Sequence, residues 1–392
     1  MSPTDGKSLE PAALDPRWVT LVAAIAPRVL GRDDRTGASL AAAVARTSEL
    51  YTTEREAIAL AAGALAARLR FYLLRDLPKI QGPLAELAAV SALPEKEVWR
   101  VIDVGAGLGT TSLGLAELAR RRGVESVEIL ALEREAAALD VFASVAREAQ
   151  AAGLVAPLRI DARPMDLERA ELARLPRADL IVVGLTLNEL FLDREDRLDA
   201  REAVLRALAE RLDEGGSLIV LEPATRAITR ELMQLRDRLA AAPEMPHVFA
   251  PCLRDAPCPL LERERDWCHA ELALALPEPL AELAEAAGLR RERLTYSYLT
   301  LRNDPRRLWD LAERDPRAYR IVGGPIGSKG KTEWEGCGAQ ALVRLRRLDR
   351  ERTPSNAALD GAARGTLLRL DRELEDGADL RARPGVVIDR LR

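Results

Sequence analysis

The spacing of hydrophobic and polar positions divides the chain into a helical first part and a mixed second part. Residues 17–92 are rich in Ala and Leu at helical spacing, with Pro78 and the pair Gly82 and Pro83 as breaks, and predict an all-helical unit. From residue 98 onward, short β-rich runs alternate with amphipathic helices. Because strands that alternate with helices pair in parallel, this pattern predicts an α/β fold with a doubly wound sheet.

The same pattern gives bounds for the elements of the second part. Strands are expected at 99–104, 127–132, 158–161, 179–183 and 217–221. Helices are expected at 110–122, 135–151, 197–212 and 227–241. Beyond residue 243 a stretch bearing Pro and Cys runs to residue 269, and it is followed by a helix at 279–287 and strands at 294–301 and 341–346.

These elements predict four parts along the chain. Residues 1–95 would form an N-terminal helical domain, and residues 96–245 a Rossmann-like core. Residues 246–350 would hold the cysteines, the last strands and a basic segment, and residues 351–392 a tail. Because the chain after Thr353 has little core material, we expect the tail to be loosely attached or partly disordered.

Composition narrows the class of protein. The chain has 392 residues, of which 48% are apolar and 31% charged, as expected for a soluble globular protein with two packed cores. No uncharged apolar run approaches the roughly 18 to 20 residues of a membrane span. The N-terminus lacks the basic start and apolar stretch of a secretory signal. We therefore expect a cytoplasmic protein with reduced thiols and no membrane partner.

Charge is unevenly distributed along the chain. The net charge is −4, which argues against a uniformly basic surface that binds nucleic acid. Residues 290–352, however, carry 16 Lys or Arg against 9 Asp or Glu. This excess is compatible with a polyanion that touches one face, and equally with an ordinary solvated surface.

A glycine-rich turn follows the first expected strand. Asp103 ends that strand, and Gly105, Ala106, Gly107 and Gly109 lead into a helix. Missing Cβ atoms let the backbone approach a ligand, as nucleotide-binding turns require. The spacing resembles motif I of the class I S-adenosylmethionine-dependent methyltransferases; a dinucleotide is the competing ligand, and a tight turn without ligand the structural alternative.

Acidic and amide residues at the ends of later strands are further candidates. Glu133 ends the second strand, where a carboxylate accepts hydrogen bonds from a cofactor ribose. Asp166 after the third strand, by the same resemblance, is a candidate for the adenine amine, unless it caps a helix. Asn188 and Glu189 end the fourth strand and could orient a methyl acceptor, or cap the next turn. No recognisable methyl-acceptor motif accompanies them, so the chemistry stays unassigned.

The four cysteines lie close together in the last third of the chain. Cys252, Cys258 and Cys268 occur within seventeen residues, and Cys337 follows between two glycines. The gaps between these cysteines are longer than those in the Cys-x2-Cys pairs that commonly bind a structural zinc ion. A cubane iron-sulfur cluster spreads four thiolates over more distance than one ion does, and favours this pattern. Zinc, possibly with His269 as a ligand, and inert buried thiols are the alternatives.

These features together resemble the methyltransferase-like assembly factors of the small ribosomal subunit, a family with mitochondrial and bacterial members. The resemblance runs from about residue 40 to 348. The segments that carry it are Asp103-Val-Gly-Ala-Gly-Leu-Gly-Thr110, Leu185-Thr-Leu-Asn-Glu-Leu190, Leu221-Glu-Pro-Ala-Thr225, Asp266-Trp-Cys-His269 and Ser297-Tyr-Leu-Thr-Leu301. The family usually has a His where this chain has Leu185, and it usually reads Pro-His after the first cysteine, where this chain has Leu253 and Arg254.

The resemblance implies a function for both groups of residues. It implies S-adenosylmethionine at the glycine turn, a four-iron, four-sulfur cluster at the four cysteines, and small-subunit ribosomal RNA as partner. Methyl transfer to RNA is one hypothesis that follows. The alternatives are a non-catalytic assembly factor that uses the fold as an RNA-docking scaffold, and a small-molecule methyltransferase.

Overall fold

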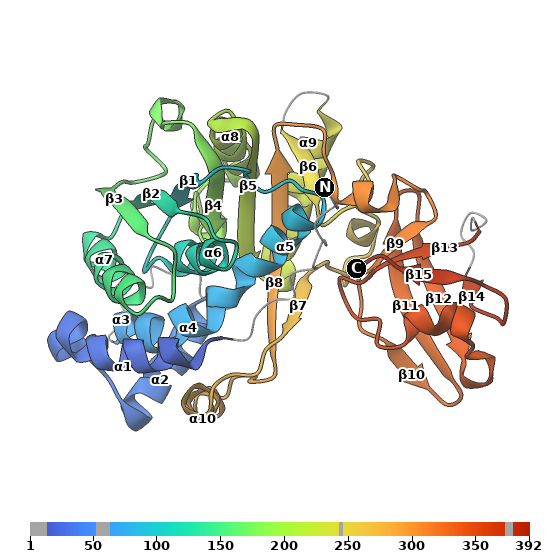
Figure 1. The fold of residues 1–392 in the computed structure, drawn as a ribbon, viewed down its shortest axis with the longest axis horizontal. Helices are drawn as coiled ribbons and strands as arrows, with labels where there is room; N and C mark the ends of the chain where they lie inside the picture. Colours follow the sequence, from blue (N-terminus) through green and yellow to red (C-terminus); the bar gives the residue numbers. More distant parts are fainter. Residues whose placement is uncertain (1–13, 52–62, 243–245, 373–378) are drawn as a thin grey trace.

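A computed structural model describes residues 14–51, 63–242, 246–372 and 379–392. The expected helical stretch at 52–62 therefore lies outside the described residues. Two sheets organise the chain, and they lie apart from each other in Figure 1. The first sheet has eight strands, in the order β3-β2-β1-β4-β5-β8-β6, with β7 paired to β8.

The first five strands of this sheet are parallel. They are β1 (Val98–Val104), β2 (Ser126–Glu133), β3 (Leu158–Pro164), β4 (Ala178–Gly184) and β5 (Leu212–Pro223). β8 (Arg293–Arg302) runs antiparallel to β5, and β6 (His247–Ala250) and β7 (Ala270–Ala273) run antiparallel to β8. The predicted α/β fold with a doubly wound sheet is confirmed.

Helices cover both faces of this sheet, which is why its central strands are apolar along nearly their whole length. α6 (Thr110–Arg121) and α7 (Ala136–Ala151) pack on one face, and α8 (Arg197–Ala209) and α9 (Arg226–Ala241) on the other. α10 (Glu278–Ala286) precedes β8. The predicted bounds are right to within a few residues, although α8 ends at Ala209 because β5 begins at Leu212.

The N-terminal helices share a hydrophobic core with the first sheet. They are α1 (Pro16–Leu30), α2 (Gly37–Glu49), α3 (Ala64–Ala67), α4 (Leu73–Asp76) and α5 (Gln81–Ala89), with single turns η4 (Arg68–Tyr72) and η5 (Leu77–Ile80) between them. Buried Trp18, Phe71 and Leu77 belong to the same hydrophobic cluster as Trp99 of β1 and Phe142 of α7. From α3 to α5 the chain runs diagonally past α6 (Figure 1).

The second sheet is formed entirely by residues after β8. Its order is β14-β12-β11-β9-β13-β15, with β10 paired to β11. The strands are β9 (Ala318–Ile321), β10 (Ile326–Ser328), β11 (Lys331–Gly338), β12 (Leu342–Leu348), β13 (Leu367–Leu370), β14 (Leu380–Arg381) and β15 (Ile388–Arg390). Its own core includes Trp334, Leu345, Leu359 and Leu368.

Two expectations about the last part of the chain need correction. The described residues after Thr353 do not form a loosely attached tail, because β13 pairs with β9 and β15, and Leu367 and Leu368 are almost fully buried. Residues 373–378 lie outside the described part. The boundary at 245 also does not end the first sheet, since β6, β7 and β8 complete it.

A buried polar group connects the second sheet to the first. Nη2 of Arg320, on β9, donates to Oε1 of Glu86 at 2.7 Å and to the hydroxyl of Tyr298 at 2.9 Å. Glu86 comes from α5 and Tyr298 from β8, so one guanidinium joins three regions of the chain. No helix in the described part of the chain is long and apolar enough to cross a membrane.

Candidate cofactor and thiol sites

The glycine turn lies between β1 and α6 and needs backbone angles that favour glycine. Gly105, Gly107 and Gly109 have φ values of 72°, 53° and 77°, in the left-handed region. Because helix α6 begins at Thr110, its first amide groups lie directly after this turn. The sequence prediction of a strand, a glycine turn and a helix is therefore correct here.

The three glycines have different neighbours. A Cβ atom on Gly105 would lie 2.2 Å from Oγ1 of Thr186, and one on Gly109 would lie 2.0 Å from Cδ2 of Phe142. A Cβ atom on Gly107 would meet only Nη2 of Arg68, at 3.3 Å. Protein packing thus requires glycine at 105 and 109, whereas the one close neighbour at Gly107 is the end of the flexible Arg68 side chain.

Glu133 ends β2 beside this turn. Its Oε2 accepts a hydrogen bond from the Gly107 amide at 2.9 Å, and its Oε1 accepts one from the Glu135 amide at 3.0 Å. Each carboxylate oxygen has a second lone pair that can accept a further bond. Glu133 is therefore held in place while it remains able to bind a pair of hydroxyl groups.

Asp103 is buried beneath the turn. Its Oδ2 accepts a hydrogen bond from Oγ of Ser112 at 2.6 Å, and its Oδ1 has no partner among the described residues. Burial raises the pKa of Asp103 to about 7, and the bond from Ser112 opposes that rise. Asp103 connects the end of β1 to α6 and does not line the cavity described next.

The glycine turn opens into a cavity of about 710 Å³. Glu133 and the ends of β4 and β5 form one side of it, through Gly184, Leu185, Thr186, Leu221 and Pro223. The N-terminal helices supply the other side, through Tyr51, Arg68, Tyr72, Arg75, Asp76 and Lys79. The volume is in the range of sites that enclose a cofactor-sized molecule.

The remaining sequence candidates divide between this cavity and the rest of the fold. Glu189 lines the cavity, and its enclosure by protein raises its pKa to about 7. The Asn188 side chain is buried elsewhere, and its backbone carbonyl accepts a bond from Arg201 Nη2 at 2.9 Å. Asp166 does not line the cavity, and its Oδ1 accepts from the Glu168 amide at 3.1 Å, as a turn cap does.

Sequence reasoning missed the polar residues that the N-terminal helices bring to the cavity. Arg68 forms an ion pair of 2.7 Å with Glu135, and Lys79 forms one of 3.0 Å with Asp76. In a helical sequence such residues read as a solvated face. Asp76 and Lys79 flank Pro78, and this proline was the available signal for that pair, because proline kinks or breaks a helix.

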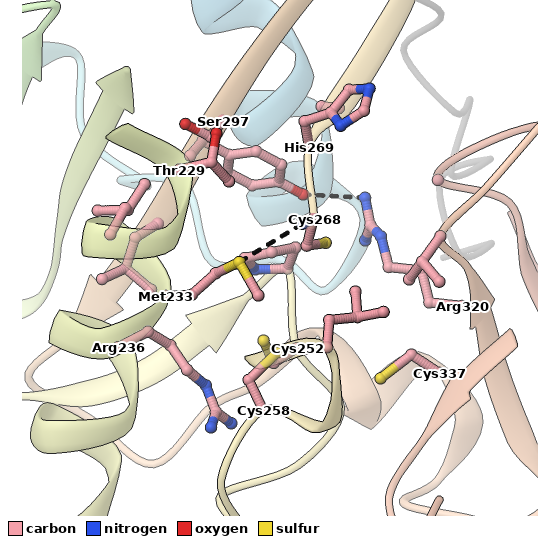
Figure 2. Close-up of a pocket in the computed structure, with 18 of the residues that line it drawn as sticks. Thr229, Met233, Arg236, Cys252, Cys258, Cys268, His269, Ser297, Arg320 and Cys337 are labelled. Carbon is pink, nitrogen blue, oxygen red and sulfur yellow. Dashed lines mark hydrogen bonds between the residues drawn. The ribbon is translucent and has the colours of Figure 1, made fainter. Parts of the chain in front are cut away.

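The four cysteines line a second cavity, of about 60 Å³, between α9, β8 and the second sheet (Figure 2). Cys252 and Cys258 lie on the loop after β6, Cys268 lies two residues before the start of β7, and Cys337 lies on β11. All four are free thiols. The cavity exceeds the roughly 10–15 Å³ that one water needs on the same measure, so it is larger than a packing defect.

Backbone contacts fix the loops that carry these cysteines. The Cys258 amide donates to Oδ2 of Asp237 at 2.9 Å, and the Cys268 amide donates to Sδ of Met233 at 3.4 Å. Both partners are on α9. Nε1 of Trp267 donates to the carbonyl of Ala224 at 3.1 Å, which ties the loop to residues that line the cofactor cavity.

The thiols lie in a buried environment with cationic neighbours. Burial, together with the other cysteines, raises the pKa of Cys258 to about 12 and that of Cys268 to about 11, and raises that of Cys337 further. Arg236 also lines this cavity, and its Nε and Nη2 have no partner in the described part of the chain. Nη1 of Arg236 pairs with Oδ1 of Asp237 at 2.8 Å, so the guanidinium keeps two buried donors that a further acceptor could satisfy.

His269 is not directed at the thiols. Its ring points away from them in Figure 2 and stacks on Trp267 at 5.9 Å between centroids. Burial lowers its pKa to about 4, which leaves the ring neutral at ordinary pH. Over the described ranges, no group of three or more Cys, His, Asp or Glu residues has the arrangement of a single-ion site.

Fold and site together define the class of protein. The strand order, with one reversed strand between β5 and β6, and the glycine turn with Glu133 at the next strand end, are those of the class I methyltransferase fold. Residues 83–348 match the family model described as "Mitochondrial small ribosomal subunit Rsm22". The chain belongs to this family.

Solved structures that match this chain share little sequence with it. One is a putative class I S-adenosylmethionine-dependent methyltransferase from Listeria monocytogenes, at 11% identity and a TM-score of 0.37, covering 74% of this chain and 90% of that chain. Another is magnesium protoporphyrin IX methyltransferase from Synechocystis, at 13% identity and a TM-score of 0.32, covering 58% of this chain and 82% of that chain. The search of curated proteins gave no match.

Proposed function

We propose that this chain is a methyltransferase-like protein that binds S-adenosylmethionine, carries a four-iron, four-sulfur cluster, and acts on or assembles the small ribosomal subunit. The observation that carries the proposal is the meeting of Cys252, Cys258, Cys268 and Cys337 at one buried cavity, next to a separate nucleoside-sized cavity. The two cavities lie near each other at the N-terminal end of α9. Residues 223–225, directly before this helix, line the cofactor cavity, and Thr229, in the helix, lines the cavity of the cysteines.

The first cavity supports binding of S-adenosylmethionine. Gly105, Ala106 and Gly107 would contact the cofactor, and the carboxylate of Glu133 would accept hydrogen bonds from the two ribose hydroxyls. Asp103 and Gly109 would act indirectly, because one anchors α6 and the other packs on Phe142. Asp166 would need a change of the β3 loop to reach the adenine, so we assign it no direct contact.

The second cavity fits the chemistry of an iron-sulfur cluster. Four cysteines supply one thiolate for each iron. Burial and mutual repulsion disfavour these thiolates without a metal, and a cationic iron core relieves both penalties. The unpaired Nε and Nη2 of Arg236 would face the residual negative charge. When bound, such a cluster supplies a cross-link between the loop after β6 and strand β11.

Metal analysis tests the cluster. Anaerobically purified wild-type protein should contain iron and acid-labile sulfide in equal amounts, and Cys337→Ser should lose most of both, because that thiol alone comes from the second sheet. His269→Gln is the matched control and should retain them, since its ring points away from the thiols. Zinc in place of iron, or full retention of iron by Cys337→Ser, would contradict the assignment.

The placement of Asn188 favours a second candidate, a non-catalytic RNA-docking scaffold. Of the two acceptor-orienting candidates, only Glu189 reaches the cofactor cavity, and Asn188 does not. Incubation of the protein with labelled S-adenosylmethionine and immature small subunits distinguishes the candidate functions. Label transferred to RNA by wild type and not by Glu133→Gln supports the enzyme. Cofactor binding without transfer supports the scaffold, and an absence of salt-sensitive RNA binding supports a small-molecule methyltransferase.

A further inference from the structure

Arg320 lies where the second sheet meets both the first sheet and the cavity of the cysteines. Its side chain is 10% exposed, and its Nη2 donates to Oε1 of Glu86 at 2.7 Å and to the hydroxyl of Tyr298 at 2.9 Å. That hydroxyl donates to Oε2 of Glu86 at 2.6 Å. The three side chains, which come from β9, α5 and β8, thus form one buried polar network.

The same guanidinium acts on the cysteines. Arg320 and Tyr298 line the cysteine cavity, whereas Glu86 does not. In Figure 2 the side chain of Arg320 extends from the second sheet toward Cys268. Burial raises the pKa of the Cys268 thiol to about 11, and Arg320 is the first of three arginines whose charge opposes that rise. Arg320 therefore lies within electrostatic reach of Cys268.

The remaining donors of Arg320 are available to a group in the cavity. A guanidinium has five N–H hydrogens, of which Nη2 carries two. Within the described part of the chain, both side-chain hydrogen bonds of Arg320 come from Nη2. Nε and Nη1 form none, and unlike Nε and Nη2 of Arg236 they are not completely buried. Because this side chain lines the cavity, Nε and Nη1 can donate to an acceptor there.

Charges and hydrogen bonds near an iron-sulfur cluster set its reduction potential. Reduction adds one negative charge, so a nearby guanidinium stabilises the reduced form more than the oxidised form. A carboxylate that pairs with the same guanidinium offsets part of this stabilisation. We propose that Arg320 is a positioning residue that donates to sulfur atoms of the cluster on the side of Cys268, and that its pairing with Glu86 sets the reduction potential; this inference rests on the proposed function.

The reduction potential of the cluster tests this proposal. It is measured on the anaerobically purified full-length chain by a titration followed by electron paramagnetic resonance, in which sodium dithionite supplies the electron. Glu86→Gln keeps the volume and the hydrogen bonds of this side chain and removes only its negative charge. It should favour reduction by about tenfold, which corresponds to about 59 mV. Glu86→Gln/Arg320→Gln also removes the guanidinium without leaving a buried unpaired carboxylate, and its potential should lie below that of wild type.

Arg392, whose Nη1 lies 3.6 Å from Oε1 of Glu86, is present in both variants, so the difference between them belongs to Arg320. The control is Asp360→Asn, which should leave the potential unchanged, because Asp360 pairs with Arg347 in the second sheet and neither residue lines the cysteine cavity.

Glu86→Gln retains Arg320, so it tests the proposal by itself if the double variant does not fold. A wild-type potential in Glu86→Gln, or equal potentials for the single and double variants, would show that Arg320 does not act on the cluster, and the proposed function would stand. Wild-type protein that contains no iron would overturn both.

Discussion

Three carboxyl groups near the ends of the parallel strands have raised pKa values, and burial is the main cause for each. The pKa is about 7 for Asp103, about 7 for Glu189 and about 8 for Glu222. Glu222 is almost completely buried at the end of β5, and its Oε2 has no partner in the described part of the chain. At the residue scale, this part of the sheet is therefore destabilised when these groups ionise.

Glu222 gives a pH-dependent prediction. Its folded-state pKa exceeds the ordinary value of 4.5, so the folded state binds its proton more tightly than the unfolded state does. The stabilisation is complete below the ordinary value and is lost as pH rises toward 8. We expect Glu222→Gln to match wild type in melting temperature near pH 5 and to exceed it by several degrees near pH 9.

Differential scanning calorimetry across this pH range provides the measurement. Glu210→Gln is a control, because that side chain is exposed directly after the end of α8. If the melting temperatures of wild type and Glu222→Gln differed by the same amount at every pH, the raised pKa of Glu222 would be contradicted.

At the scale of elements, the second sheet depends on strands from the end of the chain. β13 lies between β9 and β15, and three of its four residues are buried while Arg369 is partly exposed. Leu368 is completely buried, whereas Arg369 is partly exposed. Four-residue strands such as β13 carry little periodic signal, which explains why the sequence pattern did not reveal them.

These neighbouring residues of β13 give a matched pair of variants. We expect Leu368→Ala to cost about 2 to 5 kcal/mol of unfolding free energy, because it leaves a void in the core of the second sheet. Arg369→Ala should cost less than about 0.5 kcal/mol. Urea denaturation measures both. Equal and small losses would show that this sheet does not depend on the strand.

At the scale of the whole molecule, internal carboxylates neutralise many of the arginines in the basic segment. Arg302 and Arg306 both pair with Asp304, and Arg320 pairs with Glu86. In the described part of the chain, no ion pair is formed by Lys329, Arg344, Arg346 or Arg350, which lie on the hairpin of β10 and β11 and on or after β12. If the proposed RNA partner binds the second sheet, we expect these four residues to contact its phosphates.

Salt dependence of RNA binding tests this surface. If all four residues contact phosphates of single-stranded RNA, their replacement by Ala should reduce the slope of log affinity against log salt by roughly 3. Replacement by Ala of three exposed arginines, Arg159 on edge strand β3 and Arg169 and Arg174 between β3 and β4, should leave the slope unchanged. The slope can be measured by filter binding between about 50 and 200 mM salt. If both sets of variants had the same salt slope, RNA would bind to a surface other than the one formed by these four residues.

Local sequence pattern was enough to predict the parallel sheet, the glycine turn and the place of Glu133 at a strand end. Each depends on local chemistry: strand and helix periodicity, backbone angles that glycine tolerates, and an acidic residue at the end of the next strand. Neighbouring parallel strands end at the same edge of a sheet, so Glu133 and Gly107 had to lie close together.

Only the tertiary structure decided how distant segments meet. Cys337 reaches the other three cysteines because β9, β11 and Arg320 attach the second sheet beside β8, and no local pattern contains that attachment. Likewise, Asp76 and Lys79 enter the cofactor cavity because the N-terminal helices pack on α6. Contacts between residues far apart in sequence depend on packing of complementary surfaces, which hydrophobic periodicity does not specify.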